Sequence, residues 1–217
     1  MNTTRPAAPI RLHHHALSGH VHRVELFLNL LDLPFEKVKV DIFKREQRSP
    51  AFLARNPFGQ IPVIDDGELT VADSNAILVY LAKRYDASGR WLPDDPVGAA
   101  KVQRWLSVAA DQLANGPATV RFAALVGRPC DDSVIKESKA LFQLMDSELA
   151  AQPFLAAATP TIADLALYAY TAHAPEGGIS LEPYPSVRAW LARVEALPRF
   201  VGMQRSPVVV AAAAGAA

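Results

Sequence analysis

The first 85 residues alternate between the two-residue period of strands and the longer period of helices. Residues 10–14 predict a first strand, and alternating apolar positions over 38–42 predict a second. Between them, residues 16–22 predict a loop, followed by a helix that ends at Leu33-Pro34 because a residue before proline disfavours helix. The apolar face of that helix comprises Val24, Phe27, Leu28 and Leu31. Ser49-Pro50 then predicts the capped start of a short second helix.

The stretch from residue 56 to residue 81 predicts a hairpin followed by a third helix. Apolar, strand-type residues flank Asp66-Gly67, and glycine tolerates the positive φ of a tight hairpin turn. These strand-type residues are Val63, Ile64, Leu69 and Val71. Asp73 and Ser74 stand at the start of the helix, where either side chain could cap free N–H groups. The same helix end is polarised for anions, so Ser74 could instead bond a ligand carboxylate while Asp73 pairs with an ammonium group.

A proline stands at the mouth of the hairpin, in the pair Ile61-Pro62. Proline cannot donate to a sheet ladder, so it occupies strand starts and edges. An X-Pro bond can also be cis, and a cis bond here would turn the N–H and C=O of Ile61 outward. An extended peptide could then pair with Ile61 as an added strand. Spacing alone leaves the isomer open.

The second half of the chain predicts helices throughout. Residues 86–96 are rich in turn-forming residues and indicate a linker. Helical spacing follows over 97–115, 133–150, the apolar run 165–170, and 186–197. We therefore expect a first domain over 1–85, a linker over 86–96 and an all-helical domain over 97–217.

Capping residues mark two of these helices. Thr161 and Asp164 have the spacing of a capping box, with aspartate in place of glutamate or glutamine. Ser186 predicts the cap of the last helix, and Pro198 predicts its end. Thr161 and Asp164 are therefore interpreted as a folding device rather than a ligand site.

Composition and charge exclude several classes of function. The 22 basic and 22 acidic residues balance, which gives no general attraction to nucleic acid or to an anionic membrane. Cys130 is the only cysteine, so neither an intrachain disulfide nor a cysteine metal cluster can form. No apolar run approaches the ~20 residues that span a bilayer, and the N-terminus lacks the apolar core of a signal peptide. We therefore expect a cytoplasmic protein, with a frayed alanine-rich tail over 211–217.

Three short motifs together carry a family resemblance. They are Asn56-Pro57, Ile61-Pro62 and Asp73-Ser74, within NPFGQIPVIDDGELTVADSNAILVYL. This stretch resembles the glutathione-binding half of cytosolic glutathione transferases, and in particular the bacterial, theta- or beta-like enzymes of serine type. The family usually has glutamate where Asp73 stands, so the shorter side chain alters the reach to the ligand.

The resemblance covers nearly the whole chain and agrees with the predicted order of elements. That order is strand, helix, strand, helix, strand, strand, helix. A right-handed crossover makes the first two strands parallel, and the hairpin adds an antiparallel edge. We expect an α/β thioredoxin-like N-terminal domain followed by an all-α C-terminal domain.

The resemblance implies a glutathione site on the first domain, with glutathione as cosubstrate. Ile61, beside Pro62, would bond the cysteinyl backbone of the tripeptide. Asp73 and Ser74 would hold its γ-glutamyl end. The remaining contacts would come from Gln60, which would reach the glycyl carboxylate, and from Gln47, with Arg48 and Lys44 as nearby alternatives.

A transferase of this type must ionise the glutathione thiol, whose pKa of about 8.5 leaves little thiolate at neutral pH. A hydroxyl that donates to the sulfur favours the anion, and a helix N-terminus adds to the effect. Ser18, in the loop after the first strand, resembles the catalytic serine of theta-like enzymes. Because that loop varies in length, the N–H of Gly19 or the side chain of His20 could contact the sulfur instead.

The adjacent histidines His13, His14 and His15 raise the question of a metal site. Neighbours along a strand point to opposite faces, so these side chains converge poorly on one ion. No cysteine or acid cluster follows at zinc spacing. We therefore predict no metal, and interpret His20 and His22 as loop residues beside the ligand.

The electrophile would bind against the first helix after the linker. Ser107, Asp111 and Asn115 are four residues apart and would share one face of a continuous helix. The resemblance implies that this face lines the cleft, with Phe122 at its flank. Trp105 is interpreted as a core residue.

The preferred function is a glutathione transferase that joins the tripeptide to a soft, hydrophobic electrophile, acting in detoxification. The alternatives are a non-catalytic glutathione-binding protein of the same fold and a glutathione-dependent peroxidase or isomerase. A thiol reductase is disfavoured because no cysteine follows the first strand. The resemblance also implies a homodimer in which the first domain of one subunit meets the second domain of the other, and gives no reason to expect nucleic acid or membrane as a partner.

Overall fold

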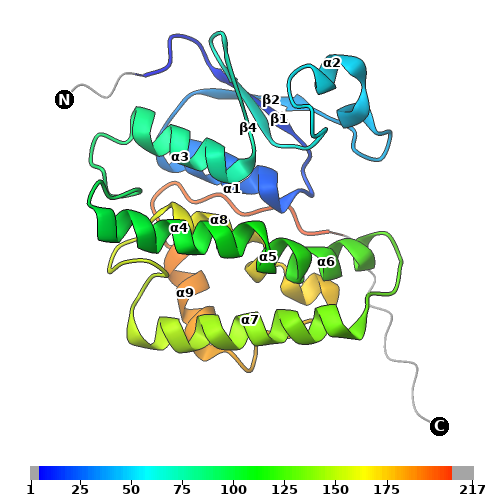
Figure 1. Cartoon of the computed structure of the whole chain (residues 1–217), viewed down its shortest axis with the longest axis vertical. Coiled ribbons are helices and arrows are strands. Elements are labelled where there is room, and N and C mark those ends of the chain that lie inside the picture. Colours follow the sequence, from blue (N-terminus) through cyan, green and yellow to red (C-terminus); the bar gives the residue numbers. More distant parts are fainter. Residues whose placement is uncertain (1–4, 207–217) are drawn as a thin grey trace.

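In the computed structural model, which describes residues 5–206, an α/β layer packs against a layer of helices (Figure 1). The α/β layer contains β1 (Ile10–His14), α1 (Gly19–Leu30), β2 (Phe35–Lys39), η1 (Glu46–Arg48), α2 (Pro50–Leu53), β3 (Val63–Asp66), β4 (Leu69–Ala72) and α3 (Ser74–Tyr85). The helical layer contains α4 (Pro96–Ala110), α5 (Gln112–Asn115), α6 (Pro117–Leu125), α7 (Asp132–Ala151), α8 (Ile162–Ala172), η2 (Ala174–Gly177) and α9 (Pro185–Glu195). The predicted fold class is confirmed, while the predicted frayed tail lies outside the described residues.

The four strands form one mixed sheet in the order β2-β1-β3-β4. β1 pairs parallel with β2, and β3 pairs antiparallel with both β1 and β4. The parallel pair follows from the crossover through α1, and the antiparallel edge follows from the hairpin at Gly67, whose φ is 60°. The predicted pairing is therefore confirmed.

Two boundaries in the α/β layer differ from the prediction. α1 begins at Gly19 rather than after residue 22, because the Ser18 hydroxyl caps it by accepting from the Val21 N–H at 3.3 Å. β2 ends at Lys39, before the predicted apolar positions 40 and 42. The Asp41 carboxylate accepts from the backbone N–H groups of Phe43 and Lys44, at 3.1 and 3.2 Å, and this local turn ends the strand.

The predicted helix 97–115 is two helices. Asp111 has φ −112° and ψ −82°, outside the helical region, so α4 ends at Ala110 and α5 is a separate short turn. α6 was not predicted, although Pro117 occupies its first helical position, which favours proline. The predicted cap at Ser186 is wrong, because α9 begins one residue earlier, at Pro185.

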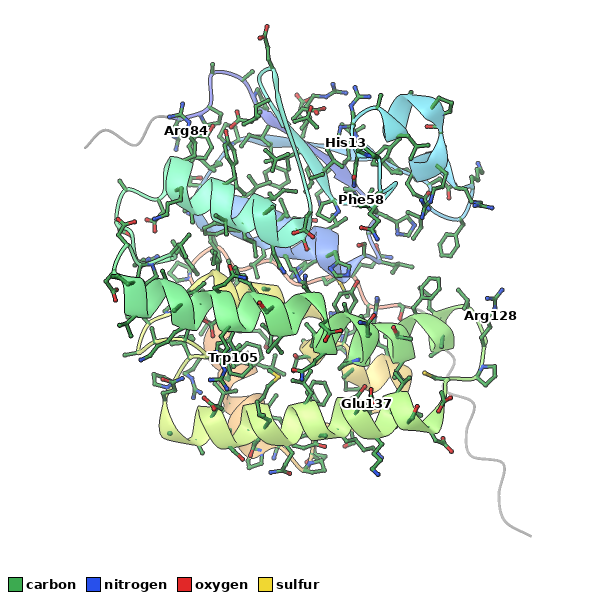
Figure 2. The ribbon with its side chains drawn as sticks, viewed as in Figure 1. His13, Phe58, Arg84, Trp105, Arg128 and Glu137 are labelled. Carbon is green, nitrogen blue, oxygen red and sulfur yellow. The ribbon has the colours of Figure 1, made fainter. Side chains whose placement is uncertain are left out.

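The buried helix α8 forms the centre of the helical layer and packs against both α4 and α1. Its predicted capping box is present, and the buried Asp164 carboxylate accepts from the N–H groups of Leu155 and Thr161 at 2.9 and 2.8 Å. Asp164 also accepts from the indole N–H of Trp190 on α9 at 2.9 Å. Trp105 fills the space between α4 and α7 (Figure 2), as predicted for a core residue. Within residues 5–206, no helix has the length and apolar character needed to cross a bilayer.

Candidate functional site

A cleft of about 770 Å³ opens between the α/β layer and helices α4 to α6. It collects residues from four separate parts of the α/β layer and from one wall of the helical layer. Its lining comprises His20, Arg23, Ile42, Phe43, Gln47, Arg48, Gly59, Gln60, Ile61, Pro62, Asp73, Ser74, Asn75, Ala110, Ala114, Asn115 and Phe122. The cleft therefore contains seven of the residues predicted to contact glutathione, and not Ser18; the seven are His20, Gln47, Gln60, Ile61, Pro62, Asp73 and Ser74.

The backbone at Ile61 lies at the rim of the sheet. The Ile61-Pro62 bond is cis, and β3 begins only at Val63. In the described part of the chain, Ile61 makes no backbone–backbone hydrogen bond, so its N–H and C=O remain available to a ligand. The buried Asn56 side chain braces the preceding turn by donating to the Gln60 carbonyl at 2.8 Å. This contact gives the Asn56-Pro57 motif a structural role.

Of the two roles expected for Asp73 and Ser74, Asp73 caps the helix and Ser74 is left available to a ligand. The Asp73 carboxylate caps α3 by accepting from the N–H groups of Asn75 and Ala76, both at 2.9 Å. Asp73 has a φ of 72°, a conformation that is rare for a side-chain-bearing residue and that clusters at functional sites. The Ser74 hydroxyl takes no part in the cap and lies buried at the base of the cleft, at 3.1 Å from the Arg23 guanidinium.

Arg23 is a buried cation that the sequence pattern did not indicate. It is 1% exposed and donates to the Ser74 hydroxyl and, more weakly, to the Asn75 side chain at 3.4 Å. Its guanidinium also lies over the Tyr170 ring, 5.7 Å from the centroid. Within residues 5–206 it forms no ion pair with a carboxylate, and burial lowers its pKa to about 10. Asp73 acts on this pKa in the opposite direction, although the two groups form no ion pair in the described residues. A buried cation that is not ion-paired there suits an anionic ligand at the base of the cleft.

The first turn of α1 places Ser18 and His20 in different hollows. His20 lines the cleft, with its ring edge-to-face against Tyr170 at 5.0 Å, and burial lowers its pKa to about 3. Ser18 lines a separate hollow of about 290 Å³. That hollow also includes His14, His15, His22, Glu25, Lys37, Met203 and Gln204. The structure thus brings His20, and not Ser18, together with Ile61 and Ser74.

Two family models match the chain, the glutathione S-transferase N-terminal domain over residues 8–83 and the C-terminal domain over residues 123–198. Glutathione S-transferase 3 of Zea mays is 34% identical over 204 residues, which cover 89% of this chain and 92% of that protein. The chain belongs to the glutathione S-transferase family. Family membership supports glutathione conjugation as its chemistry.

Solved structures of the family have the same fold as this chain. A glutathione S-transferase from Pseudomonas fluorescens has a TM-score of 0.85 and 34% identity, covering 90% of this chain and 99% of that one. A glutathione transferase homolog from Drosophila mojavensis, solved with bound glutathione, has a TM-score of 0.79 and 27% identity, covering 88% and 89%. The predicted family is confirmed, while the bacterial, theta- or beta-like serine subtype stays a prediction.

The residues predicted for the electrophile pocket of this transferase are only partly in the cleft. Asn115 and Phe122 line it, and Phe122 is 52% exposed. Ser107 is exposed outside the cleft, where it donates to the Gln103 carbonyl at 3.1 Å. Asp111 lines a different hollow, between α5 and α7. Asn115 lines this second hollow as well, and its amide donates to the Asp111 carboxylate at 2.8 Å. The non-helical backbone at Asp111 therefore separates Ser107, and not Asp111, from Asn115.

Where the loop after β2 meets the turn before Ile61, the cleft is lined by polar residues. Gln47 has a buried side-chain oxygen that has no hydrogen-bond partner among residues 5–206, and Gln60 is exposed beside it. Arg48 also lines the cleft and donates to the Phe58 carbonyl at 3.0 Å. Lys44, the other predicted alternative, does not line the cleft.

The adjacent histidines point to separate partners, as expected for neighbours on a strand. His13 is buried and bonds the Asp65 carboxylate at 2.9 Å. His15 accepts from the Leu17 N–H at 3.3 Å.

Two apolar residues that the sequence pattern did not assign to the site, Ile42 and Phe43, complete the lining of the cleft.

Proposed function

We propose that this protein binds glutathione in the cleft, stabilises its thiolate and transfers it to a soft, hydrophobic electrophile. One observation carries the proposal. The free backbone of Ile61, the buried Ser74 hydroxyl and the N-terminus of α3 all lie in one cleft with Arg23, a buried cation that forms no ion pair within residues 5–206. Together these groups suit an extended peptide that carries a carboxylate at one end.

The tripeptide would lie along this wall with each group matched to a partner. Its cysteinyl backbone would pair with Ile61, as an added strand does. Its γ-glutamyl carboxylate would bond the Ser74 hydroxyl, and its ammonium group would face the free oxygen of Asp73. Its glycyl carboxylate would accept from the side-chain amide N–H groups of Gln60 and Gln47, both of which line the cleft at that end.

The chemical step uses the cosubstrate as the nucleophile. The thiol first loses its proton to solvent. The thiolate sulfur then attacks an electrophilic carbon and forms a carbon–sulfur bond, and the leaving group departs with its bonding electrons. The protein supplies orientation and a lower thiol pKa from the first turn of α1, where Ser18 and His20 are the candidate donors.

The direct test is conjugation of chlorodinitrobenzene, in which the leaving group is chloride. We expect turnover that saturates with glutathione. Binding of glutathione without turnover across a panel of electrophiles would instead support a binding protein, and activity only toward hydroperoxides or isomerisable substrates would support a peroxidase or isomerase. Turnover that survives Ser18→Ala would remove the Ser18 hydroxyl from the mechanism.

We also propose a homodimer, on the family resemblance, and on the same basis a cytoplasmic location and a role in detoxification. Two exposed apolar side chains support the dimer. They are Phe58, which is 77% exposed and is labelled in Figure 2, and Leu144, which is 46% exposed and lines a groove of about 790 Å³ between α4 and α7. Sedimentation at micromolar concentration should give twice the chain mass of 23.5 kDa, and a single-chain mass would refute the dimer.

A further inference from the structure

The turn that leads into α1 is held by a side chain of the helical layer. Leu17 is the residue before the Ser18 cap, and its C=O accepts from the Arg121 guanidinium of α6 at 2.8 Å, across 104 positions of sequence. The N–H of Leu17 donates to Nδ1 of His15 at 3.3 Å. Within residues 5–206, the helical layer makes no other hydrogen bond to residues 15–18. Arg121 therefore fixes the one polar group of Leu17 that local contacts leave open.

Arg121 is itself held in a fixed position. It is 3% exposed, and its Nε donates to the Glu176 carboxylate at 2.7 Å. Glu176 in turn bonds Nδ1 of His173 at 2.6 Å and accepts from the Ser206 N–H at 3.2 Å. The positive charge of Arg121 is thus balanced by an adjacent carboxylate. Arg121 offers Leu17 a placed hydrogen-bond donor rather than an isolated charge.

The opposite side of the same turn is closed by Tyr170 of α8. An added Cβ on Gly19 would lie 2.7 Å from a carbon of the buried Tyr170 ring. The ring also packs edge-to-face against His20, with centroids 5.0 Å apart. The start of α1 therefore lies between two fixed groups of the helical layer, the Arg121 guanidinium and the Tyr170 ring.

The position of this turn matters because both candidate sulfur donors follow it directly. Ser18 and His20 lie one and three residues after Leu17, so a displaced Leu17 displaces both. A hydrogen bond weakens steeply when its angle departs from linear, and a small misplacement of a reacting group costs a large factor in rate. Arg121 does not line the cleft, so any effect that it has on the sulfur passes through the turn.

We propose that Arg121 is a positioning residue, which through the Leu17 carbonyl holds the first turn of α1 where its donor meets the glutathione sulfur. The inference rests on the proposed function and deepens it, and it holds whether Ser18 or His20 is the donor. Arg121 keeps its protons throughout, so it adds no covalent step.

The test measures the pKa of bound glutathione from the ultraviolet absorbance of its thiolate as pH is varied. Removing Arg121 alone would leave Glu176 as a buried charge without its cation, which is strongly destabilising. The double variant Arg121→Met/Glu176→Gln avoids this and is compared with Glu176→Gln, which keeps the donor to Leu17. Loss of the donor should raise the thiol pKa by about 1, part of the effect of a hydrogen bond to a charged group.

The pH profile of conjugation separates positioning from a general structural role. With the thiol pKa raised by about 1, kcat/KM for chlorodinitrobenzene should fall roughly tenfold at pH values below that pKa. Above it the loss should disappear, because the thiol is ionised without help. Arg121→Lys keeps a cationic donor and should restore part of the difference. A loss of equal size at every pH would overturn the inference.

Two further variants serve as controls. Trp190→Phe removes a buried hydrogen bond of the helical layer, from the indole N–H to Asp164 at 2.9 Å, and should leave the thiol pKa unchanged. An equal shift in this variant would mean that any loosening of the helical layer has the same effect. Glu176→Gln alone should also leave the thiol pKa unchanged. A fall in that variant as large as the rise on removing Arg121 would show that charge acts, and not position.

Binding of S-methylglutathione distinguishes failure of this inference from failure of the proposed function. The analogue has no ionisable thiol, so the double variant should bind it as tightly as Glu176→Gln does. Failure of the unaltered protein to bind it would contradict the proposed function itself. If the unaltered protein binds it and removal of Arg121 leaves the thiol pKa of glutathione unchanged, Arg121 does not position the donor.

Discussion

The cleft has two walls, which differ in how their side chains are held. We call the side formed by Arg23, Ile61 and Ser74 the glutathione wall, and the side formed by Asn115 and Phe122 the electrophile wall. On the glutathione wall, Ser74 is 3% exposed and Arg23 is 1% exposed, and the two are hydrogen-bonded to each other. Asn56, which is 3% exposed, braces this wall through its bond to the Gln60 carbonyl. On the electrophile wall Phe122 is 52% exposed, and Phe43, which lines the cleft from the loop after β2, is 58% exposed. Fixed polar groups suit one invariant cosubstrate, whereas exposed apolar side chains can repack around varied partners. Under the proposed function, the difference teaches that selection for glutathione and tolerance of electrophiles would have separate structural origins.

The two walls are nevertheless tied together behind the cleft. The buried Arg121 of α6 donates to the Leu17 carbonyl at 2.8 Å, just before the cap of α1. Its Nε also donates to Glu176 at 2.7 Å, and Glu176 bonds His173 and the Ser206 hydroxyl. The electrophile wall is thus anchored to the first turn of α1, which carries the candidate sulfur donors Ser18 and His20.

The largest effect is expected from Ser74→Ala on the glutathione wall. Loss of a buried hydrogen bond to a ligand carboxylate costs about 1.5–3 kcal/mol, so the Kd for glutathione should rise roughly 10- to 100-fold. Calorimetric titration measures the change, with Ser147→Ala on the exposed face of α7 as the control. An unchanged Kd would show that Ser74 does not contact the ligand.

Gly19→Ala should have the next largest effect, because the added methyl group disrupts the packing between α1 and α8. The new methyl group would lie 2.7 Å from the buried ring of Tyr170, and overpacking of this kind costs about 1–3 kcal/mol. Denaturant unfolding should show the loss in free energy of unfolding. Gly202→Ala is the matched control, since its nearest neighbour would be at 3.9 Å. Equal stability of the two variants would contradict the close approach.

Glu176→Gln tests the tie between the walls. Burial alone would raise the pKa of Glu176, but hydrogen bonds from Ser206, His173 and Arg121 outweigh it and lower the pKa to about 2. A depressed folded pKa stabilises the protein above the unfolded value of 4.5, and this stabilisation is lost as pH falls toward 2. The variant should be less stable by about 1 kcal/mol at neutral pH. In thermal unfolding, this gap should narrow below pH 4.5, and a gap that is independent of pH would contradict the assignment.

The smallest effect is expected from Phe122→Ala on the electrophile wall. Removing a half-exposed ring should lower kcat/KM for an aromatic electrophile by roughly 3- to 10-fold, through lost apolar contact. The Kd for glutathione should stay the same. Leu69→Ala on β4, a similarly exposed apolar residue outside the cleft, is the control. A comparable loss of glutathione affinity would mean that the two walls do not act separately.

The contrast between the walls also explains what the sequence could predict. Asp66-Gly67, Ile61-Pro62 and Asp73-Ser74 act through turns and helix ends that depend on adjacent residues, so local chemistry predicts them. The electrophile wall depends on the course of the chain at Asp111, which ends α4 without proline or glycine. The apolar periodicity therefore predicted one continuous helix over 97–115, which wrongly placed Ser107 in the cleft.

Long-range contacts account for the other differences. Arg23 bonds Ser74, which is 51 residues away, and the carbonyl of Ala109, which is 86 residues away. No pattern within α1 reports such partners. Ser18 and His20 are two residues apart at the start of one helix, so the rotation of its first turn decides which side chain enters the cleft.

Calorimetric titration of the unaltered protein with glutathione tests the central claim most directly. The account predicts saturable binding of one tripeptide per chain, with a heat signal that weakens strongly in Ser74→Ala. The absence of any heat of binding at millimolar glutathione would contradict the account.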